Sequence, residues 1–297
     1  MNANPTVLAY LLLALTTLFW GGNSVAGRMA VGEISPMLLT AGRWGIAFLI
    51  LAALGWREIR AEAATIRANR LWLAVMAFIG FAFFNICLYI ALHYTTAVNS
   101  SVLQAAMPVF VFAASYFWHG QRTRAGQIVG FVVTLAGVAV IAAEGSLSTF
   151  ATMSFNPGDL LVIGAIAVYG LYTVALRDKP ALHWKSLMAA LTALAFLTSL
   201  PFAIAEAALG YAQAPTPTGW ALLAYTAIFP SILAQVFWIR GNELIGANRA
   251  GLFINLVPVF GTLLAILILG ERLHGYHAVA LALVMGGIAI AEKRKGR

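Results

Sequence analysis

The chain carries one segment twice, and this repeat constrains its fold more than any other feature. Residues 107–142 begin Met107-Pro108-Val109-Phe110, and residues 257–292, 150 positions later, begin Val257-Pro258-Val259-Phe260. Closer to the N-terminus a second match occurs at an offset of 149. Equivalent pairs include Gly120 and Gly270, Arg122 and Arg272, Gly137 and Gly287, Trp20 and Tyr169, Ser24 and Thr173, and Arg28 and Arg177. Soluble solenoids repeat at shorter periods of roughly 20–50 residues, so the pattern predicts two copies of one large unit.

The composition places both units in a membrane. Hydrophobic residues make up 62% of the chain and charged residues 9%, with a mean hydropathy of +0.89, whereas a soluble domain carries about 25% charged residues. A membrane-spanning helix needs roughly 20 apolar residues. We therefore predict an all-α, polytopic membrane protein with ten transmembrane helices and no separate soluble domain. The expected spans are 6–26, 36–56, 71–92, 97–118, 126–144, 158–178, 185–206, 219–240, 248–269 and 276–292.

The positive charge indicates the orientation of the chain. The formal net charge is +8. If the N-terminus is cytoplasmic, 15 of the 18 Lys and Arg residues fall in cytoplasmic loops or in the C-terminal tail. Such a bias predicts that both termini face the cytoplasm. It also accounts for the basic charge without nucleic acid, which is not an expected partner.

Two arginines on the outer side, Arg28 and Arg272, indicate how the copies are related. Their equivalents, Arg177 and Arg122, fall on the cytoplasmic side. An odd number of helices per copy leads to the same conclusion, because the second copy then enters the membrane from the opposite face. We expect inverted five-helix repeats at residues 1–145 and 146–297, an arrangement common in secondary transporters.

Several short motifs resemble a known family. They are Phe19-Trp20-Gly21-Gly22-Asn23, Arg43, Pro-Val-Phe at 108–110 and 258–260, Leu269-Gly270-Glu271-Arg272 and Gly286-Gly287-Ile288. In order and spacing they resemble EamA-type transporters of the drug/metabolite transporter superfamily, over essentially the full chain. The resemblance implies two five-helix domains and export of metabolites, amino acids or drugs, and the aromatic residues are similar to those of aromatic amino acid exporters. Two departures are that Gln121 stands where the second copy has Glu271, and that the first copy lacks an equivalent of Asp159.

Polar and aromatic residues within the predicted spans form two sets. A polar side chain inside the membrane is costly unless it faces the bundle interior, a cavity or a partner. Residues three or four apart share a helix face, so each set is predicted to line one half-cavity beside a central substrate site. Packing between helices or an aromatic belt at the membrane surface is the alternative. The outer set is Trp20, Asn23, Ser24, Asn85, Tyr89, Ser100, Ser101 and Gln104, and the inner set is Tyr169, Tyr172, Thr173, Gln235, Trp238 and Asn255.

One charge and two prolines lie inside predicted spans. Arg43 falls about 10 Å into the second span at 1.5 Å per residue. It either clamps a substrate carboxylate with paired donors, or it is structural and snorkels outward or binds helix-end carbonyls. The structural interpretation is favoured because the second helix is not among the predicted lining helices. Pro108 and Pro258 occupy equivalent positions near mid-span and are expected to kink their helices, as hinges or as static bends.

The acidic residues and histidines are expected at the periphery. Glu144, Asp159, Glu206 and Glu271 fall at outer span ends, and His93, His274 and His277 are also peripheral. No group of them has metal-ligand spacing, and the single cysteine, Cys87, excludes an intramolecular disulfide. We expect no metal and no cofactor. Proton antiport and facilitated diffusion both remain open.

These features together predict a transporter of the bacterial inner membrane, whose partners are the lipid bilayer and a small-molecule substrate. The expected activity is export of small neutral or zwitterionic metabolites by alternating access, with amino acids that include aromatic and bulky apolar ones as cargo. The alternatives are an exporter of cationic or hydrophobic drugs and a channel-like facilitator. An enzyme is not expected, because no nucleophile–base or metal pair converges at membrane depth.

Overall fold

Helices form all the regular structure of the described chain. The computed structural model describes residues 5–119, 125–146, 156–245 and 251–292. The first half contains α1 (Pro5–Met29), α2 (Pro36–Ala61), α3 (Ala63–Ala68), α4 (Arg70–Ala77), η1 (Phe78–Ala82), α5 (Phe83–Ala91), α6 (Ala97–Gln104), α7 (Met107–His119) and α8 (Ala125–Ala142). The second half contains α10 (Pro157–Ala175), η2 (Leu176–Asp178), α11 (Trp184–Ala208), α12 (Pro217–Ile228), η3 (Phe229–Leu233), α13 (Ala234–Ile245), η4 (Gly251–Leu256), α15 (Val257–Leu269) and α16 (Gly275–Glu292).

Local signals set where several of these helices begin. Thr96 precedes α6, and its hydroxyl accepts the backbone N–H of Asn99. Thr216 makes the same contact at the start of α12, where Pro217 follows it. Asn156 precedes Pro157 at the start of α10 and accepts the N–H of Gly158. A short polar side chain satisfies an N–H that the helix leaves unpaired, and proline is tolerated there because its missing N–H has no partner in the first turn.

Among the described residues, seven helices are long and apolar enough to cross a membrane, and they correspond to the first four and the sixth to eighth predicted spans. Three shorter apolar helices, Ile128–Val140, Val257–Leu269 and Gly275–Gly287, lie within the remaining predicted spans. Large apolar side chains such as Leu49, Leu197 and Leu267 are exposed, as expected of a surface that faces lipid. The prediction of a multi-pass all-helical protein is therefore confirmed. The count of ten crossings and the orientation of the termini stay predictions.

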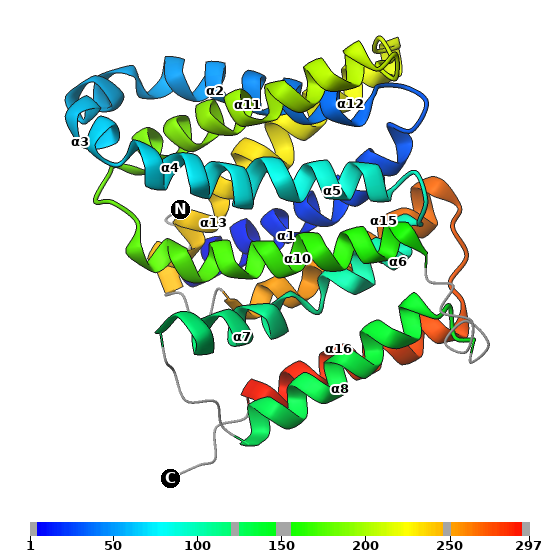
Figure 1. Ribbon diagram of the computed structural model, residues 1–297. Coiled ribbons are helices and arrows are strands. Elements are labelled where there is room, and N and C mark those ends of the chain that lie inside the picture. Colours follow the sequence, from blue (N-terminus) through cyan, green and yellow to red (C-terminus); the bar gives the residue numbers. More distant parts are fainter. Residues whose placement is uncertain (1–4, 120–124, 147–155, 246–250, 293–297) are drawn as a thin grey trace.

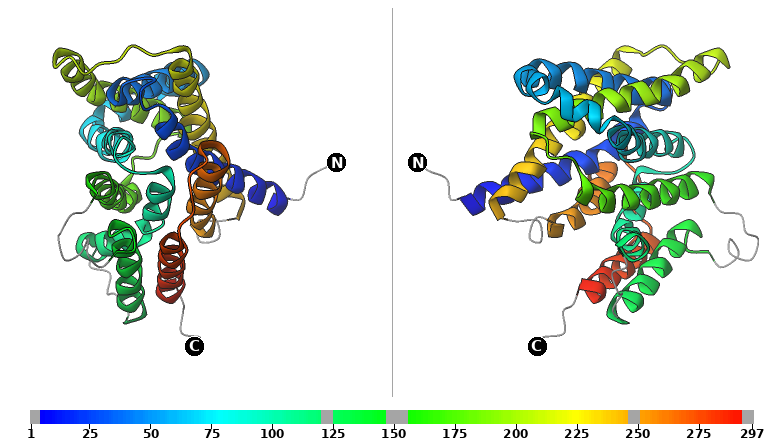
Figure 2. Two further views of the ribbon diagram at one scale, coloured as in Figure 1. Left: turned by 90° about the vertical axis from the view of Figure 1, so that its right-hand side faces the viewer. Right: turned by 60° about the vertical axis from the view of Figure 1, so that its left-hand side comes forward.

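Helices from the two halves of the chain pack against each other throughout the bundle. α2 lies along α11, α8 along α16, α1 against α13 and α15, and α10 against α5 and α7. In Figure 1, α2 and α11 run side by side in opposite directions, as do α8 and α16. The views in Figure 2 show α8 and α16 as a pair at one edge of the molecule. Each of these contacts joins segments that are far apart in the sequence.

Glycines allow the closest of these approaches at equivalent positions. A Cβ added to Gly21 of α1 would lie 2.6 Å from the backbone nitrogen of Gly261 in α15. A Cβ added to its repeat equivalent, Gly170 of α10, would lie 2.8 Å from the Cβ of Phe110 in α7. Small residues let helix backbones approach closely in membranes, so the repeat extends to packing between the halves.

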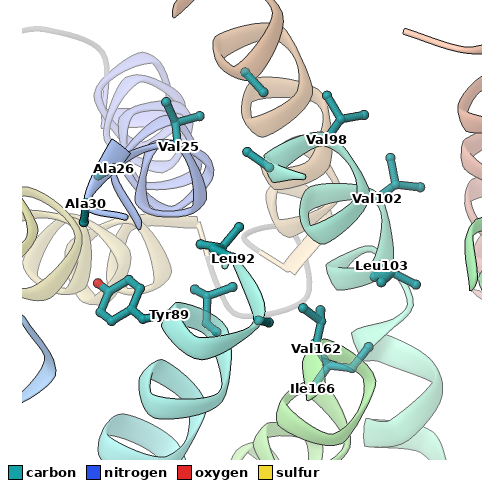
Figure 3. Packing of buried hydrophobic residues seen from close by; sticks show 14 of the residues in the cluster. Val25, Ala26, Ala30, Tyr89, Leu92, Val98, Val102, Leu103, Val162 and Ile166 are labelled. Carbon is teal, nitrogen blue, oxygen red and sulfur yellow. The ribbon is translucent and has the colours of Figure 1, made fainter. Parts of the chain in front are cut away.

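Two large apolar clusters lie in the core of the bundle. The larger joins α1, α5, α6 and α10 through residues such as Val25, Leu92, Val102 and Ile166 (Figure 3). A second joins α2 and α4 with α11, and Trp44 belongs to it. The buried polar residues described next lie between these apolar contacts.

Candidate functional site

Arg43 lies at the centre of a buried polar cluster. Its side chain comes from α2 and is only 2% exposed. Nη1 donates to Oδ1 of Asn23 (2.9 Å), to Oδ1 of Asn85 (2.6 Å) and to the hydroxyl of Tyr89. Nε and Nη2 donate to Oγ of Ser231 at 3.0 and 2.7 Å. These five residues, which we call the Arg43 cluster, come from α1, α2, α5 and η3, so both halves of the chain contribute.

Each partner of Arg43 is held by a further hydrogen bond. The Tyr89 hydroxyl donates to Oδ1 of Asn23 at 2.9 Å. Nδ2 of Asn85 donates to the Phe81 carbonyl at 2.7 Å, and Oγ of Ser231 donates to the Thr226 carbonyl at 2.8 Å. These further hydrogen bonds hold the oxygens in place around the guanidinium, as in a preorganised polar network.

Two π-helical turns lie beside this cluster. η1 and η3 interrupt corresponding helices of the two copies, and each spans five residues. A π turn is rare and is frequent at functional sites. η1 contains Phe81, whose carbonyl receives Asn85, and η3 contains Ser231 itself. One turn thus holds Asn85 of the Arg43 cluster, and the other supplies Ser231.

The position that we favoured for the Arg43 side chain, at the membrane surface or on helix-end carbonyls, is wrong. The guanidinium neither snorkels outward nor binds helix-end carbonyls, because it is buried and its hydrogen bonds within the described chain go to side chains. Its Cζ also lies 4.8 Å from the ring centroid of Trp44 and 5.8 Å from that of Tyr89. α2 therefore contributes to the same cluster as three residues of the predicted outer set.

Aromatic contacts join the predicted outer set to the inner set. Trp20 of α1 meets Trp238 of α13 with ring centroids 5.5 Å apart. Tyr169 of α10 contacts Phe84 of α5 at 5.2 Å and its own neighbour Tyr172 at 5.1 Å. Each contact between different helices crosses from one half of the chain to the other. The two sets therefore meet inside the bundle.

The remaining predicted site residues have more local contacts. Nε2 of Gln104 donates to Oγ of Ser24 at 2.9 Å and to the Ser100 carbonyl at 3.2 Å, whereas the Thr173 hydroxyl donates to the Tyr169 carbonyl of its own helix. Ser101 is buried against Gly261, and its hydroxyl has no hydrogen-bond partner within the described structure. Gln235 is half-buried, and the side chain of Asn255 lies outside the described residues.

The two prolines begin new helical segments instead of bending continuous ones. α6 ends at Gln104 and α7 begins at Met107, so Pro108 is the second residue of α7. In the other copy the 3-10 helix η4 ends at Leu256, and Pro258 lies in the first turn of α15. Proline is compatible with a first turn. The expectation of a mid-helix kink is therefore corrected to a broken helix in each copy, and the hinge role stays a prediction.

A second buried polar cluster lies at the end of the bundle predicted to face outside. Asp159 of α10 is 0% exposed and accepts hydrogen bonds from Thr95 at 2.5 Å and from Nδ2 of Asn99 at 3.4 Å. Oδ1 of Asn99 lies 2.7 Å from Nε2 of His277 in α16. We call these four residues the Asp159 cluster. It links α6 to α10 and α16, so Asp159 and His277 lie near helix starts, as expected, and are buried there.

The hydrogen bonds of the Asp159 cluster have one consistent direction. Nδ1 of His277 accepts the backbone N–H of His274 at 2.9 Å. Nε2 therefore carries the ring proton and donates to Asn99, whose amide nitrogen donates to Asp159. Glu271 binds the start of α6 beside this cluster, where its carboxylate accepts the N–H groups of Ala97 and Val98 at 3.0 and 2.9 Å.

A polytopic helical membrane protein with a polar cluster buried between two matched halves has the architecture of a transporter. The chain belongs to the EamA-like transporter family, whose model matches residues 7–143 and again residues 156–292. The repeat seen in the sequence is thus two copies of this family's unit.

Relatives cover almost the whole chain. An uncharacterized transporter, YetK, of Bacillus subtilis is 28% identical over 97% of this chain and 87% of its own length. The aromatic amino acid exporter YddG of Ancylobacter novellus is 23% identical, covering 94% of this chain and 96% of that protein. A probable terminal-alkyne amino-acid exporter of Streptantibioticus cattleyicolor is 26% identical over 95% and 92%. A crystal structure with 22% identity, a TM-score of 0.64 and 96% coverage of both chains shares the fold.

Proposed function

We propose that this transporter exports small neutral or zwitterionic metabolites, and that amino acids with aromatic or bulky apolar side chains are among them. The observation that carries the proposal is the meeting of polar and aromatic side chains from both halves inside the bundle. Asn23, Asn85 and Ser231 offer polar groups there, and Trp20 and Trp238 offer apolar surface nearby. A small-molecule site combines such walls with a few placed polar groups.

The mechanism we propose is alternating access between inverted halves in the bacterial inner membrane. Its support is that corresponding parts of the two copies run in opposite directions, as α2 and α11 do in Figure 1. α1 crosses α15 at Gly21, and α10 crosses α7 at Gly170, in matched fashion. If one pair separates while the other stays closed, the central residues face one side of the membrane at a time. The breaks before α7 and α15 are the proposed hinges.

The amino acid assignment has a separate support in the relatives. Two of them carry names that describe amino acid export, one for aromatic amino acids and one for a terminal-alkyne amino acid. Aromatic rings of Trp20, Tyr169 and Tyr172 would contact an apolar side chain of the cargo. The site residues that we propose are those of the two predicted sets, with Arg43 and Ser231 added.

Transport by the purified protein in proteoliposomes tests this proposal. We expect saturable uptake of labelled phenylalanine, tryptophan or leucine, and Trp20→Ala should lower the rate about tenfold, because its contact with Trp238 joins the two halves. Trp220→Ala is the matched control, since Trp220 lies on α12 and is 58% exposed. Equal loss of transport in both variants, or no uptake of any apolar amino acid by the wild type, would contradict the proposal.

A further inference from the structure

The charge of Arg43 has no anionic partner in the part of the chain that the structure describes. The described ion pairs are Glu58 with Lys185 and Arg240 with Glu243. The groups that face Arg43 are two amide oxygens, a phenol and a serine hydroxyl, all neutral. Removing a charge from water is costly, and a charged partner compensates for it far better than neutral dipoles do.

The surroundings of Arg43 also contain more donors than acceptors. Its guanidinium has five N–H groups, and they share four acceptor atoms, on Asn23, Asn85, Tyr89 and Ser231. The neighbouring indole N–H of Trp44 is buried and has no hydrogen-bond partner among the described residues. A ligand group that only accepts hydrogen bonds and carries a negative charge matches this surplus. An ionised carboxylate has both properties.

Structural bonding alone does not explain why this position holds a charge. Asn85 and Ser231 are each anchored to a backbone carbonyl, and Tyr89 is anchored to Asn23, independently of Arg43. A neutral donor of similar size could complete these contacts without the cost of a buried cation. The charge is therefore the feature that requires a function.

We propose that Arg43 binds the carboxylate of the transported molecule, which restricts the cargo to molecules with a carboxylate beside an apolar or aromatic group. The inference rests on the proposed function and names the substrate class of that site. When the halves move apart, a carboxylate replaces the oxygens of Asn23 and Asn85 and accepts one N–H of Nη1 and one N–H of Nη2 in parallel. Cationic drugs without a carboxylate are repelled by the same charge.

Two measurements with matched ligand pairs test this inference. Phenylalanine, tryptophan and leucine are each compared with their primary amides, which have the same shape but no carboxylate. The first readout is inhibition of labelled amino acid uptake in proteoliposomes, and the second is the shift of the thermal-unfolding midpoint in detergent. For the wild type we expect each amide to act about tenfold or more weakly than its acid, the effect of one lost hydrogen bond to a charged group.

Variants of Arg43 separate binding from folding. Arg43→Lys keeps the charge and should keep the preference for the acid, with weaker binding because the paired donors are lost. Arg43→Gln should lose the preference, so that acid and amide act alike, while a single cooperative unfolding transition shows that the variant is folded. Equal action of acid and amide on the wild type, or an unchanged preference in Arg43→Gln, overturns this inference alone. If none of the three amino acids binds or is transported, both this inference and the proposed function are contradicted.

Discussion

Nη1 of Arg43 lies 2.6 Å from Oδ1 of Asn85, and the amide nitrogen of the same Asn85 lies 2.7 Å from the Phe81 carbonyl of the π turn η1. One asparagine thus connects the buried cation to the irregular backbone of its own helix. A π turn leaves the usual helical hydrogen bonding disturbed, and Asn85 compensates by donating to that backbone. Asn85 therefore joins Arg43 of α2 to the π turn η1, which lies in the third predicted span.

This connection predicts the effect of removing the amide. Asn85→Leu leaves an N–H of Arg43 and the Phe81 carbonyl without their partner, and each unmet buried group costs about 1–3 kcal/mol. We expect a clear drop of the thermal-unfolding midpoint and loss of transport. Asn69→Leu at the end of α3 is the control, since among the described residues its side-chain amide bonds only to the Thr65 carbonyl. Equal midpoints for the two variants would refute the connection.

The packing of α1 on α15 makes a second prediction. Gly21→Ala would bring a methyl group to 2.6 Å from the backbone of Gly261. Since backbone cannot yield as a side chain does, we expect a loss of roughly 1–3 kcal/mol and slower transport. Gly286→Ala, also in an apolar helix, has no atom within 4 Å of the added Cβ. A thermal-unfolding midpoint of Gly21→Ala as high as that of Gly286→Ala would show that the helices are not in this contact.

The Asp159 cluster should hold one end of the bundle closed. Both carboxylate oxygens of Asp159 accept hydrogen bonds, so Asp159→Asn removes the charge that strengthens them and replaces one of the two acceptor oxygens by an N–H donor. In the first copy, Tyr10 stands at the position equivalent to Asp159, and Gln127 at the position equivalent to His277. The first copy therefore has no carboxylate at either of these two positions. We expect Asp159→Asn to favour the state that is open at this end.

Labelling of a buried cysteine measures that opening. Ser100, in α6, is 0% exposed, and in a Cys87→Ser background Ser100→Cys becomes the single thiol. A membrane-impermeant thiol reagent added outside cells should react about fivefold or more faster when Asp159→Asn is also present, given roughly 1–3 kcal/mol for an unmet hydrogen bond. Glu144→Gln, at an exposed position after α8, should leave the rate unchanged. The same rate in all three proteins would exclude the gating role.

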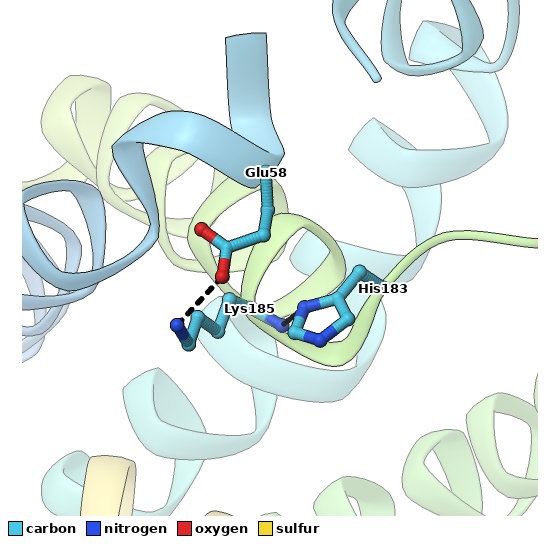
Figure 4. Close-up of polar contacts among 3 residues, drawn as sticks. All are labelled: Glu58, His183 and Lys185. Carbon is cyan, nitrogen blue, oxygen red and sulfur yellow. Dashed lines mark hydrogen bonds and ion pairs between the residues drawn. The ribbon is translucent and has the colours of Figure 1, made fainter. Parts of the chain in front are cut away.

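The ion pair at the opposite end should matter little. Nζ of Lys185 lies 2.7 Å from Oε1 of Glu58, with both side chains near 30% exposed, and Nδ1 of His183 accepts the Lys185 backbone N–H (Figure 4). Exposed pairs contribute little because water screens them. We expect Glu58→Gln to leave both the unfolding midpoint and transport within replicate error. A large loss in either would mean that this end of α2 and α11 depends on the charge.

The sequence was sufficient for the helical architecture and for part of the site. Apolar runs placed the helices close to where they lie, and prolines at positions 36, 157 and 217 begin three of them. Helical spacing put Asn85 and Tyr89 on one face, and both indeed reach Arg43. Such spacing identifies a face but not its neighbour, because the neighbour depends on the tilt and rotation of packed helices.

The contacts that sequence reasoning missed join residues from different helices. Ser231 reaches Arg43 from the second half of the chain, and it lies in the π turn η3, which the apolar pattern did not predict. η1 contains no proline, so no local signal announced it. The sequence placed Asp159 and His277 at helix starts, where they lie, but it did not indicate that both are buried and linked through Asn99 of α6. Burial at a helix end is a property of tertiary packing.

Counterflow in proteoliposomes tests most directly whether this protein is an alternating-access exporter of amino acids. Vesicles loaded with unlabelled phenylalanine are diluted into a trace of labelled phenylalanine, and the label is followed with time. A carrier predicts a transient accumulation of label above equilibrium, saturable with internal amino acid and absent from protein-free vesicles. A rise to equilibrium without overshoot, at a rate independent of the internal amino acid, would contradict alternating access.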